Sequence, residues 1–460
     1  MVKFTPKKVG IAGACMIIYG VLLGIAILPL VVNYAVKMKV ALKQGWFMRE
    51  IWSKFPFPMY LQFYFFNVTN PDGVQKGEKP ILQQIGPFAY EQWQEKVNQV
   101  DHEEDDTITF NFKNTYIFST ERSGDLTGDE EIVVPNYFIL GLVNILLRER
   151  PSTIPIVGKA VDSIYKKPTT IFIKVKVRDL LFDGIPIDCS ATDFAGAAVC
   201  GELKTQHKEF GMEVIGENQY LFSLWRTRNA TESKEFRVLR GLKNIMDVGK
   251  VLEYDHKPNI SKWDDEFCDT FNGTDGTVFH PFFDKKGRDD IVLFNSQLCR
   301  SLSAWYVGKT KVSGLSTMRY TTDLGTDPEA NPRHKCYCAA PDNCMKKGAY
   351  DAFKCMGLPL VVTNPHFYNA DPEFLEQVEG LNPNPELHTV AIDLDPFVGS
   401  PLVAHARAQF NMYIMKVEKF KLMKTFPNAL LPLFWIDEET VLPKFLVKEI
   451  KLGHMGNALG

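Results

Sequence analysis

Alternating apolar and polar residues predict β-strands in three distant parts of the chain. Residues 107–113 show it best, because Ile108, Phe110 and Phe112 alternate with polar residues, and segments 171–178 and 409–414 repeat the pattern. A period of two is typical of a half-buried strand. Strands near both ends of the sequence favour one large sheet-based domain, closed by pairing between distant segments, over a string of separate domains.

Two short helices are predicted between the first two of these strands, over 136–147 and 157–165, with breaks at Pro151 and Pro155. The first helix is apolar nearly all round. Such a helix fits burial in a core, a lipid-facing surface or a hydrophobic entrance, and the core is the default interpretation.

Residues 9–32 carry no charged side chain, and lysines flank them on both sides. At 1.5 Å per residue a helix over this segment spans a bilayer. A cleaved signal peptide is the alternative, but its apolar region is shorter and ends in a small-x-small site, which is missing here. We therefore expect a cytoplasmic segment 1–8, a retained membrane helix 9–32 and a single domain over 33–451.

The composition is that of a folded protein. Hydrophobic residues make up 45% and charged residues 23% of the 460 residues, which excludes a disordered, collagen-like or polytopic membrane chain. The 52 Lys and Arg nearly balance the 55 Asp and Glu, for a net charge of -3. Without a basic surface field, nucleic acid is not an expected partner.

Cysteines and glycosylation sequons place the large domain in an oxidising, extracellular compartment. Cys15 lies in the membrane segment, and the other cysteines, an even number, all follow it, as disulfides require. The sequons that begin at Asn67, Asn229, Asn259 and Asn272 also follow the membrane segment, and we predict glycans there.

The sequence limits the disulfide pairing without fixing it. Cys189 and Cys200 are neighbours in the sequence and are predicted to pair, whereas the six cysteines from Cys268 to Cys355 allow 15 connectivities. On an extended chain Cys336 and Cys338 lie too far apart for an easy bridge to each other. Zinc is an alternative for this pair, but the spacing is not that of zinc-ribbon or zinc-finger sites, so no metal is predicted.

Sequence signatures of catalysis are missing. The chain has no G-x-S-x-G, Walker A, G-x-G-x-x-G or H-E-x-x-H motif, so we predict neither an enzyme nor a bound cofactor. The acidic run 101–106 lacks the ligand spacing of an EF-hand, and we interpret it as a solvated turn before a strand.

Several distinctive motifs lie along nearly the whole chain after the membrane segment: FNVTNP at 66–71, IGPFAY at 85–90, LCRS at 298–301, GLNP at 380–383, DLDP at 393–396 and LPLFWIDE at 431–438. These motifs resemble those of class B scavenger receptors. Within that family, the segments 101–110, 244–251 and 273–279 are most similar to insect sensory neuron membrane proteins.

The resemblance implies an α+β fold: a large irregular antiparallel β-barrel ectodomain with short helices, an apical helical bundle over 136–165 and a hydrophobic tunnel. It also implies three disulfides in the cysteine-rich region 268–355, namely Cys268–Cys336, Cys299–Cys355 and Cys338–Cys344. Family members usually end in a second membrane segment, whereas 452–460 is only long enough to begin one.

The resemblance further suggests where a ligand enters. Lys166 and Lys167 resemble lysines near the lipid entrance of the fatty acid translocase branch, where a lysine would pair with a polar head while the apolar tail leaves water. An ordinary solvated turn is the alternative for this pair. The predicted ligand entrance comprises Lys166, Lys167, Phe138, Leu142, Ile145 and Leu146.

We therefore expect a plasma-membrane receptor of olfactory tissue that takes lipophilic ligands such as pheromones or fatty acids, in part from odorant-carrier proteins, and passes them to the membrane or an odorant receptor complex. A scavenger receptor for lipoprotein or phospholipid particles is the first alternative. A lysosomal-type trafficking receptor, with a protein partner at the apical helices, is the second.

Overall fold

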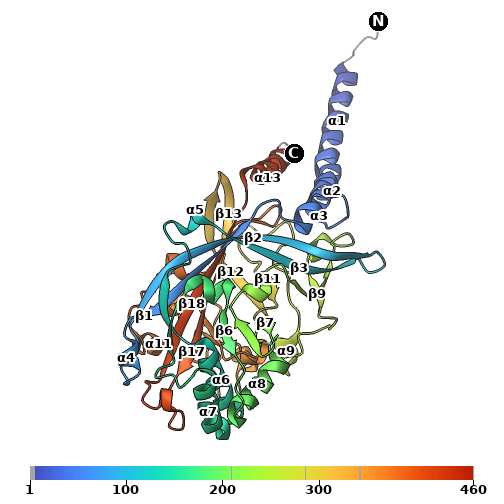
Figure 1. The fold of residues 1–460 in the computed structure, drawn as a ribbon. Helices are drawn as coiled ribbons and strands as arrows, with labels where there is room; N and C mark the ends of the chain where they lie inside the picture. Colours follow the sequence, from blue (N-terminus) through green and yellow to red (C-terminus); the bar gives the residue numbers. More distant parts are fainter. Residues whose placement is uncertain (1–5, 209, 285, 341–342, 459–460) are drawn as a thin grey trace.

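A computed structural model describes residues 6–208, 210–284, 286–340 and 343–458. Of the predicted cytoplasmic segment 1–8, residues 1–5 lie outside the described residues, as do residues 459–460 of the predicted C-terminal segment. The fold is mixed α+β and is dominated by one antiparallel sheet that curls into a barrel (Figure 1). The prediction of a barrel fold is confirmed. In spatial order the strands are β10 (Val251–Tyr254), β9 (Glu232–Leu239), β3 (Thr107–Phe118), β2 (Leu82–His102), β1 (Met59–Val68), β18 (Ala429–Val441), β17 (Ser400–Ile414), β16 (Ala391–Asp395), β13 (Leu315–Thr321), β12 (Arg300–Val312) and β11 (Ile291–Asn295).

The loop at Gly273 and Thr274 closes most of the gap between β10 and β11. Val251 N–H donates to the Gly273 carbonyl at 3.0 Å, and Thr274 N–H donates to the Val292 carbonyl at 3.1 Å. Gly273 has a φ of +81°, and a Cβ there would lie 2.0 Å from the Val292 oxygen. Only glycine can occupy this position without moving the neighbouring strand.

Pairing between distant segments holds the barrel together. In the register of β1 with β18, Phe65 lies opposite Phe434. The strand predicted over 107–113 is the first part of β3, and 409–414 is the end of the longer β17. The remaining strands are β5 (Phe172–Lys176), inside the predicted 171–178, which pairs with β4 (Glu131–Pro135); β14 (Ala349–Asp351) and β15 (Val361–Thr363); and β6 (Ile185–Asp188), β7 (Met212–Gly216) and β8 (Gln219–Phe222).

Three helices form a bundle at the end of the barrel that lies away from the N-terminal helix (Figure 1). They are α6 (Tyr137–Glu149), α7 (Ile154–Ile164) and α8 (Phe194–Gln206), and α7 packs against α8. Asn136 caps α6, because its Oδ1 accepts from two backbone N–H groups at 3.1 Å. The predicted break at Pro155 is wrong: this proline lies in the first turn of α7, where its missing N–H costs nothing.

The N-terminal helix is longer than the predicted 9–32. It runs through α1 (Pro6–Leu22), a π-helical segment (Leu23–Ile27) and α2 (Leu28–Val40). Within this helix, the stretch Val9–Ala26 is long and apolar enough to cross a membrane, and its residues are not buried against the domain. Figure 1 shows α13 (Lys444–Ala458) at the same end of the barrel. The short helices are α3 (Phe47–Ser53), α4 (Pro71–Val74), α5 (Thr120–Ser123), α9 (Glu266–Asp269), α10 (Phe353–Met356), α11 (Pro372–Glu376) and α12 (Pro385–His388).

Candidate functional site: a cavity between the apical bundle and the membrane end

A cavity of about 1610 Å³ lies inside the domain, and its walls are mostly apolar. Residues of α6 and α8 line it on the side of the apical bundle. Residues of α2, α3 and α13, the helices at the opposite end, line it as well. The cavity thus contacts both ends of the domain. Representative wall residues are Leu142 and Ile145 of α6, Val199 of α8, Val36 of α2, Ile51 of α3 and Ile450 of α13.

Small side chains on β17 leave room for this cavity. Ala404, Ala406 and Ala408 all line it, and along the strand they alternate with larger polar residues. Two of these, His405 and Arg407, each bind Asp437 at 3.0 Å. Neighbouring strand residues point to opposite faces, so the alanines leave space on one face while His405 and Arg407 bind Asp437, and Arg407 also contacts the cavity.

The structure separates the residues of the predicted ligand entrance into two groups. Phe138, Leu142, Ile145 and Leu146 line the cavity, which gives the apolar surface of α6 a partner other than solvent. Phe138 is buried, and the other three are half-buried. Three of the four side chains are thus partly exposed and all four contact the cavity, and their role in a ligand entrance stays a prediction.

Lys166 and Lys167 lie outside the described wall of the cavity. Both are exposed and occupy a turn after α7 with left-handed φ angles of 55° and 58°. The Lys167 N–H donates to the Asp162 carbonyl at 2.7 Å, which holds the turn on the last helical residues. This placement favours the alternative of a solvated turn, and a role of the pair in ligand entrance stays a prediction.

Polar groups interrupt the apolar wall, and the sequence analysis missed them. Gln92 donates to Glu438 Oε1 at 2.8 Å, and burial raises the pKa of Glu438, which favours its neutral form. On β3, Tyr116 lies opposite Gln92, and its pKa is raised by burial. Arg228 is half-buried, with its guanidinium 4.8 Å from the Trp225 ring centre, and burial lowers its pKa. All five side chains line the cavity.

Lys96 is buried behind the aromatic wall near α3. Its ammonium group lies 4.3 Å from the Trp52 ring centre and 4.9 Å from that of Phe112, both of which line the cavity. It donates to the Trp52 carbonyl at 2.9 Å and to Thr277 Oγ1 at 3.1 Å. Burial lowers the pKa of Lys96 to about 8. These cation–π contacts and hydrogen bonds fix the aromatic side chains in place.

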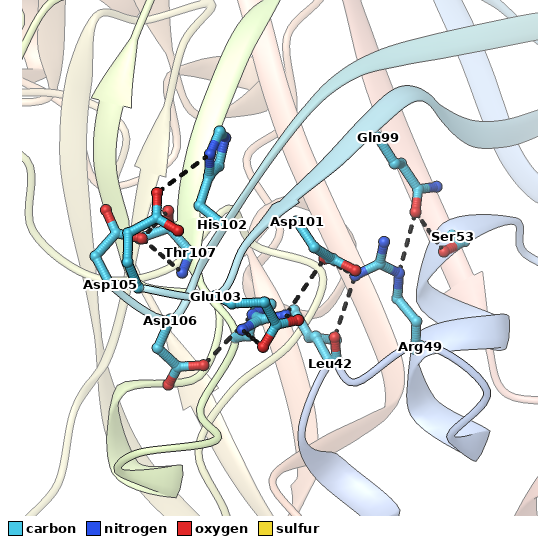
Figure 2. Close-up of polar contacts among 12 residues, drawn as sticks. Leu42, Arg49, Ser53, Gln99, Asp101, His102, Glu103, Asp105, Asp106 and Thr107 are labelled. Carbon is cyan, nitrogen blue, oxygen red and sulfur yellow. Dashed lines mark hydrogen bonds and ion pairs between the residues drawn. The ribbon is translucent and has the colours of Figure 1, made fainter.

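The acidic run 101–106 comprises the end of β2 and the turn to β3, and Figure 2 shows Asp101 of this run bonded to Arg49. Arg240 is only 2% exposed and pairs with Glu103 at 2.9 Å and with Asp106 at 3.4 Å. Asp106 is also buried, so the interpretation of the whole run as a solvated turn is wrong. The Leu42 N–H, just after α2, donates to the Arg240 carbonyl at 2.9 Å. The run therefore ties the barrel to the end of the N-terminal helix.

Four disulfides are present. Cys189–Cys200 joins the loop before α8 to the middle of that helix. In the cysteine-rich region the bonds are Cys268–Cys336, Cys299–Cys355 and Cys338–Cys344, the pairs that the resemblance implied. Bonded sulfur is not available as a thiolate ligand, so Cys336 and Cys338 cannot bind zinc in this state.

The four sequons differ in accessibility. Asn229, Asn259 and Asn272 are exposed. Asn67 lies within β1 and is half-buried, with its Oδ1 accepting the Val133 N–H at 2.8 Å.

Sequence comparison places this domain among known proteins. The profile of the CD36 family matches residues 11–459. The chain belongs to the CD36 family. Sensory neuron membrane protein 1 of Apis mellifera is 45% identical over 447 residues, which cover 97% of this chain and 85% of that relative. The same-named protein of Ostrinia furnacalis is 41% identical over 448 residues, or 97% and 84% of the two chains, and that of Plutella xylostella is 40% identical over 454 residues, or 98% and 85%.

These matches confirm the resemblance to class B scavenger receptors and, within them, to insect sensory neuron membrane proteins. The chain is accordingly a membrane receptor related to olfaction, from a family of non-enzymatic receptors.

Proposed function

We propose that this protein is a cell-surface receptor that captures long-chain lipophilic odorants, such as pheromones or fatty acids, and passes them through its cavity to the membrane of olfactory neurons. The observation that carries the proposal is the 1610 Å³ cavity, whose apolar wall includes residues of both the apical bundle and the helices at the membrane end. Typical sites for drug-sized ligands measure roughly 300–1,000 Å³, so an extended chain fits this space better than a compact ligand.

Transfer of apolar surface from water would supply the binding free energy, at roughly 0.8 kcal/mol for each buried CH2 group. Affinity should therefore rise with chain length. The same driving force has no direction, so net movement through the cavity would follow the concentration gradient of the ligand.

The orientation of the domain is part of the proposal. An outside location is supported by the disulfides and by the exposed sequon residues Asn229, Asn259 and Asn272. The relatives named sensory neuron membrane protein 1 support a sensory ligand. Odorant-carrier proteins and an odorant receptor complex are the proposed donor and acceptor of that ligand.

Ligand binding to the full chain in nanodiscs tests the proposal. The probe is a fluorescent C16 fatty acid, displaced by unlabelled acids, acetates and aldehydes of rising chain length. Ala406→Trp should obstruct the cavity at this level and weaken saturable binding, because Ala406 lines it opposite Glu438. Ile117→Trp is the matched control, since Ile117 is 52% exposed on β3. Equal binding by both variants, or displacement that ignores chain length, would contradict the proposal.

A further inference from the structure

We propose that the cavity contains a head-group site at Arg228, which binds the carboxylate of a long-chain fatty acid. This inference rests on the proposed function and deepens it, because it names the ligand class that the cavity retains and the residue that selects it. Uncharged ligands of the same length would pass Arg228 without being held.

Two arginines in one short turn have contrasting surroundings. Arg226 lies on the outside, 40% exposed, and forms an ion pair with Glu213. Arg228 is two residues further on and lines the cavity. Among the described residues, no carboxylate lies within 4.0 Å of the Arg228 guanidinium, and no side-chain hydrogen bond satisfies it. A half-buried arginine that lines a cavity and has no carboxylate partner can bind an anion there, since charges removed from water in proteins are normally paired.

The turn is held rigidly against the barrel wall. Ala230 N–H donates to the Asn114 carbonyl at 2.7 Å, and Tyr116 N–H donates to Asn229 Oδ1 at 3.0 Å. These bonds hold the turn against β3, and the Arg228 guanidinium lies over the Trp225 ring, 4.8 Å from its centre. A guanidinium fixed in this way can bind a carboxylate with two parallel hydrogen bonds.

Other groups of the wall suit an oxygen-rich head group. Ser223 Oγ and Trp225 Nε1 are buried, and neither has a hydrogen-bond partner within the described structure. Both residues line the cavity, and each of the two groups can donate a hydrogen bond to a carboxylate. Buried polar atoms rarely remain unpaired, which supports a polar ligand at this level.

The carboxyl group of Glu438 does not neutralise Arg228. Gln92 binds it at 2.8 Å, burial raises its pKa, and among the described residues it forms no ion pair with Arg228. The Arg228 guanidinium therefore has no carboxylate partner in this part of the wall, which favours an anionic head group over a cationic one.

The test compares palmitic acid with hexadecanol, which has the same chain length and no charge. Both displace a photoreactive C16 probe from the full chain in nanodiscs. Arg228→Met should weaken palmitic acid about tenfold and leave hexadecanol unchanged, as expected for loss of a charge-assisted hydrogen bond. Arg228→Lys should retain most of the preference for the acid, and Arg226→Met should match the unaltered chain. An unchanged thermal unfolding midpoint shows that each variant is folded.

Equal affinities for palmitic acid in the unaltered chain and in Arg228→Met would overturn the site while leaving the proposed function intact. Equal weakening of acid and alcohol would also overturn it, because the effect would then be steric. Absence of saturable binding for either ligand in the unaltered chain would overturn the proposed function and this site together.

Discussion

Arg49 of α3 donates from Nη1 to Asp101 Oδ1 at 2.9 Å, and so joins the first helix after the membrane segment to the end of β2 (Figure 2). The same nitrogen donates to the Leu42 carbonyl at 3.1 Å. The Arg49 side chain is buried, and Asp101 also forms an ion pair with a second arginine, Arg240, at 3.8 Å. This contact fixes the position of the barrel above the N-terminal helix.

Arg49→Met should therefore lower the free energy of unfolding by about 2 kcal/mol, because it leaves Asp101 and the Leu42 carbonyl without a donor. The control is Lys174→Met, which removes an exposed pair with Glu131 and should cost less than about 1 kcal/mol. Chemical unfolding of the full chain in detergent measures both. An equal loss of unfolding free energy in the two variants would show that the buried Arg49 contact contributes no more to stability than an exposed ion pair does.

A stacked pair of buried histidines should make the domain sensitive to acid. The rings of His366 and His388 lie 4.2 Å apart, and each Nδ1 accepts a backbone N–H, from Asn382 at 3.0 Å and Asn384 at 2.9 Å. A protonated ring could not accept these bonds. Burial lowers the pKa of His366 to about 3 and that of His388 to about 4.

These pKa values lie below the unfolded value of about 6.5, so the unfolded chain binds more protons on acidification. Stability should be unaffected by this pair above about pH 6.5 and should fall as the pH drops from there toward 4. Thermal unfolding midpoints of the full chain between pH 7.5 and 5 check this. His388→Asn should flatten the pH profile, and an unchanged slope would contradict the assignment.

Removal of two disulfides should have unequal effects. Cys299–Cys355 closes a sequence separation of 56 residues and Cys189–Cys200 one of 11. Loop entropy predicts losses of about 4 and about 3 kcal/mol for the paired Cys→Ala variants. The Cys299–Cys355 bond also joins the residue before β12 to α10, so its loss should destabilise the barrel, whereas loss of Cys189–Cys200 should loosen α8. Hydrogen exchange would locate each effect, and loosening of the same region in both variants would contradict it.

Glycan occupancy should follow exposure. Asn229→Gln, Asn259→Gln and Asn272→Gln should each increase electrophoretic mobility in protein from insect cells, because these residues are exposed. Asn67→Gln should change the mobility least, because Asn67 is half-buried within β1 and its glycan should therefore be added to the smallest fraction of chains. A glycosidase-sensitive mobility change for Asn67→Gln as large as that for the exposed sites would contradict this order.

The barrel and the bundle could be predicted from the family motifs, and the membrane helix could be predicted from the local pattern of apolar residues. Alternation at Ile108, Phe110 and Phe112 suffices to predict β3, and the length of 9–32 without charges suffices for the membrane helix. The resemblance, rather than the periodicity, implied a barrel.

The cavity wall could not be predicted in the same way. Ala404, Ala406 and Ala408 line it because they are small, and alternating alanines in a strand do not reveal which face they occupy. Arg228 is separated from Glu438 by 210 positions and adjoins a sequon, so nothing in the sequence marks it as part of the wall. The lysines at 166 and 167 adjoin the correct helix, yet the left-handed turn after α7 directs them to solvent.

Transfer of ligand into a membrane tests the central claim most directly. The full chain is reconstituted in liposomes with the domain outside, a fluorescent C16 fatty acid is presented on a soluble carrier, and its arrival in the bilayer is timed against protein-free liposomes. Our account predicts faster transfer with the unaltered chain and with Ile117→Trp, and slower transfer than either with Ala406→Trp. Transfer by Ala406→Trp at the unaltered rate would show that the ligand does not travel through the cavity.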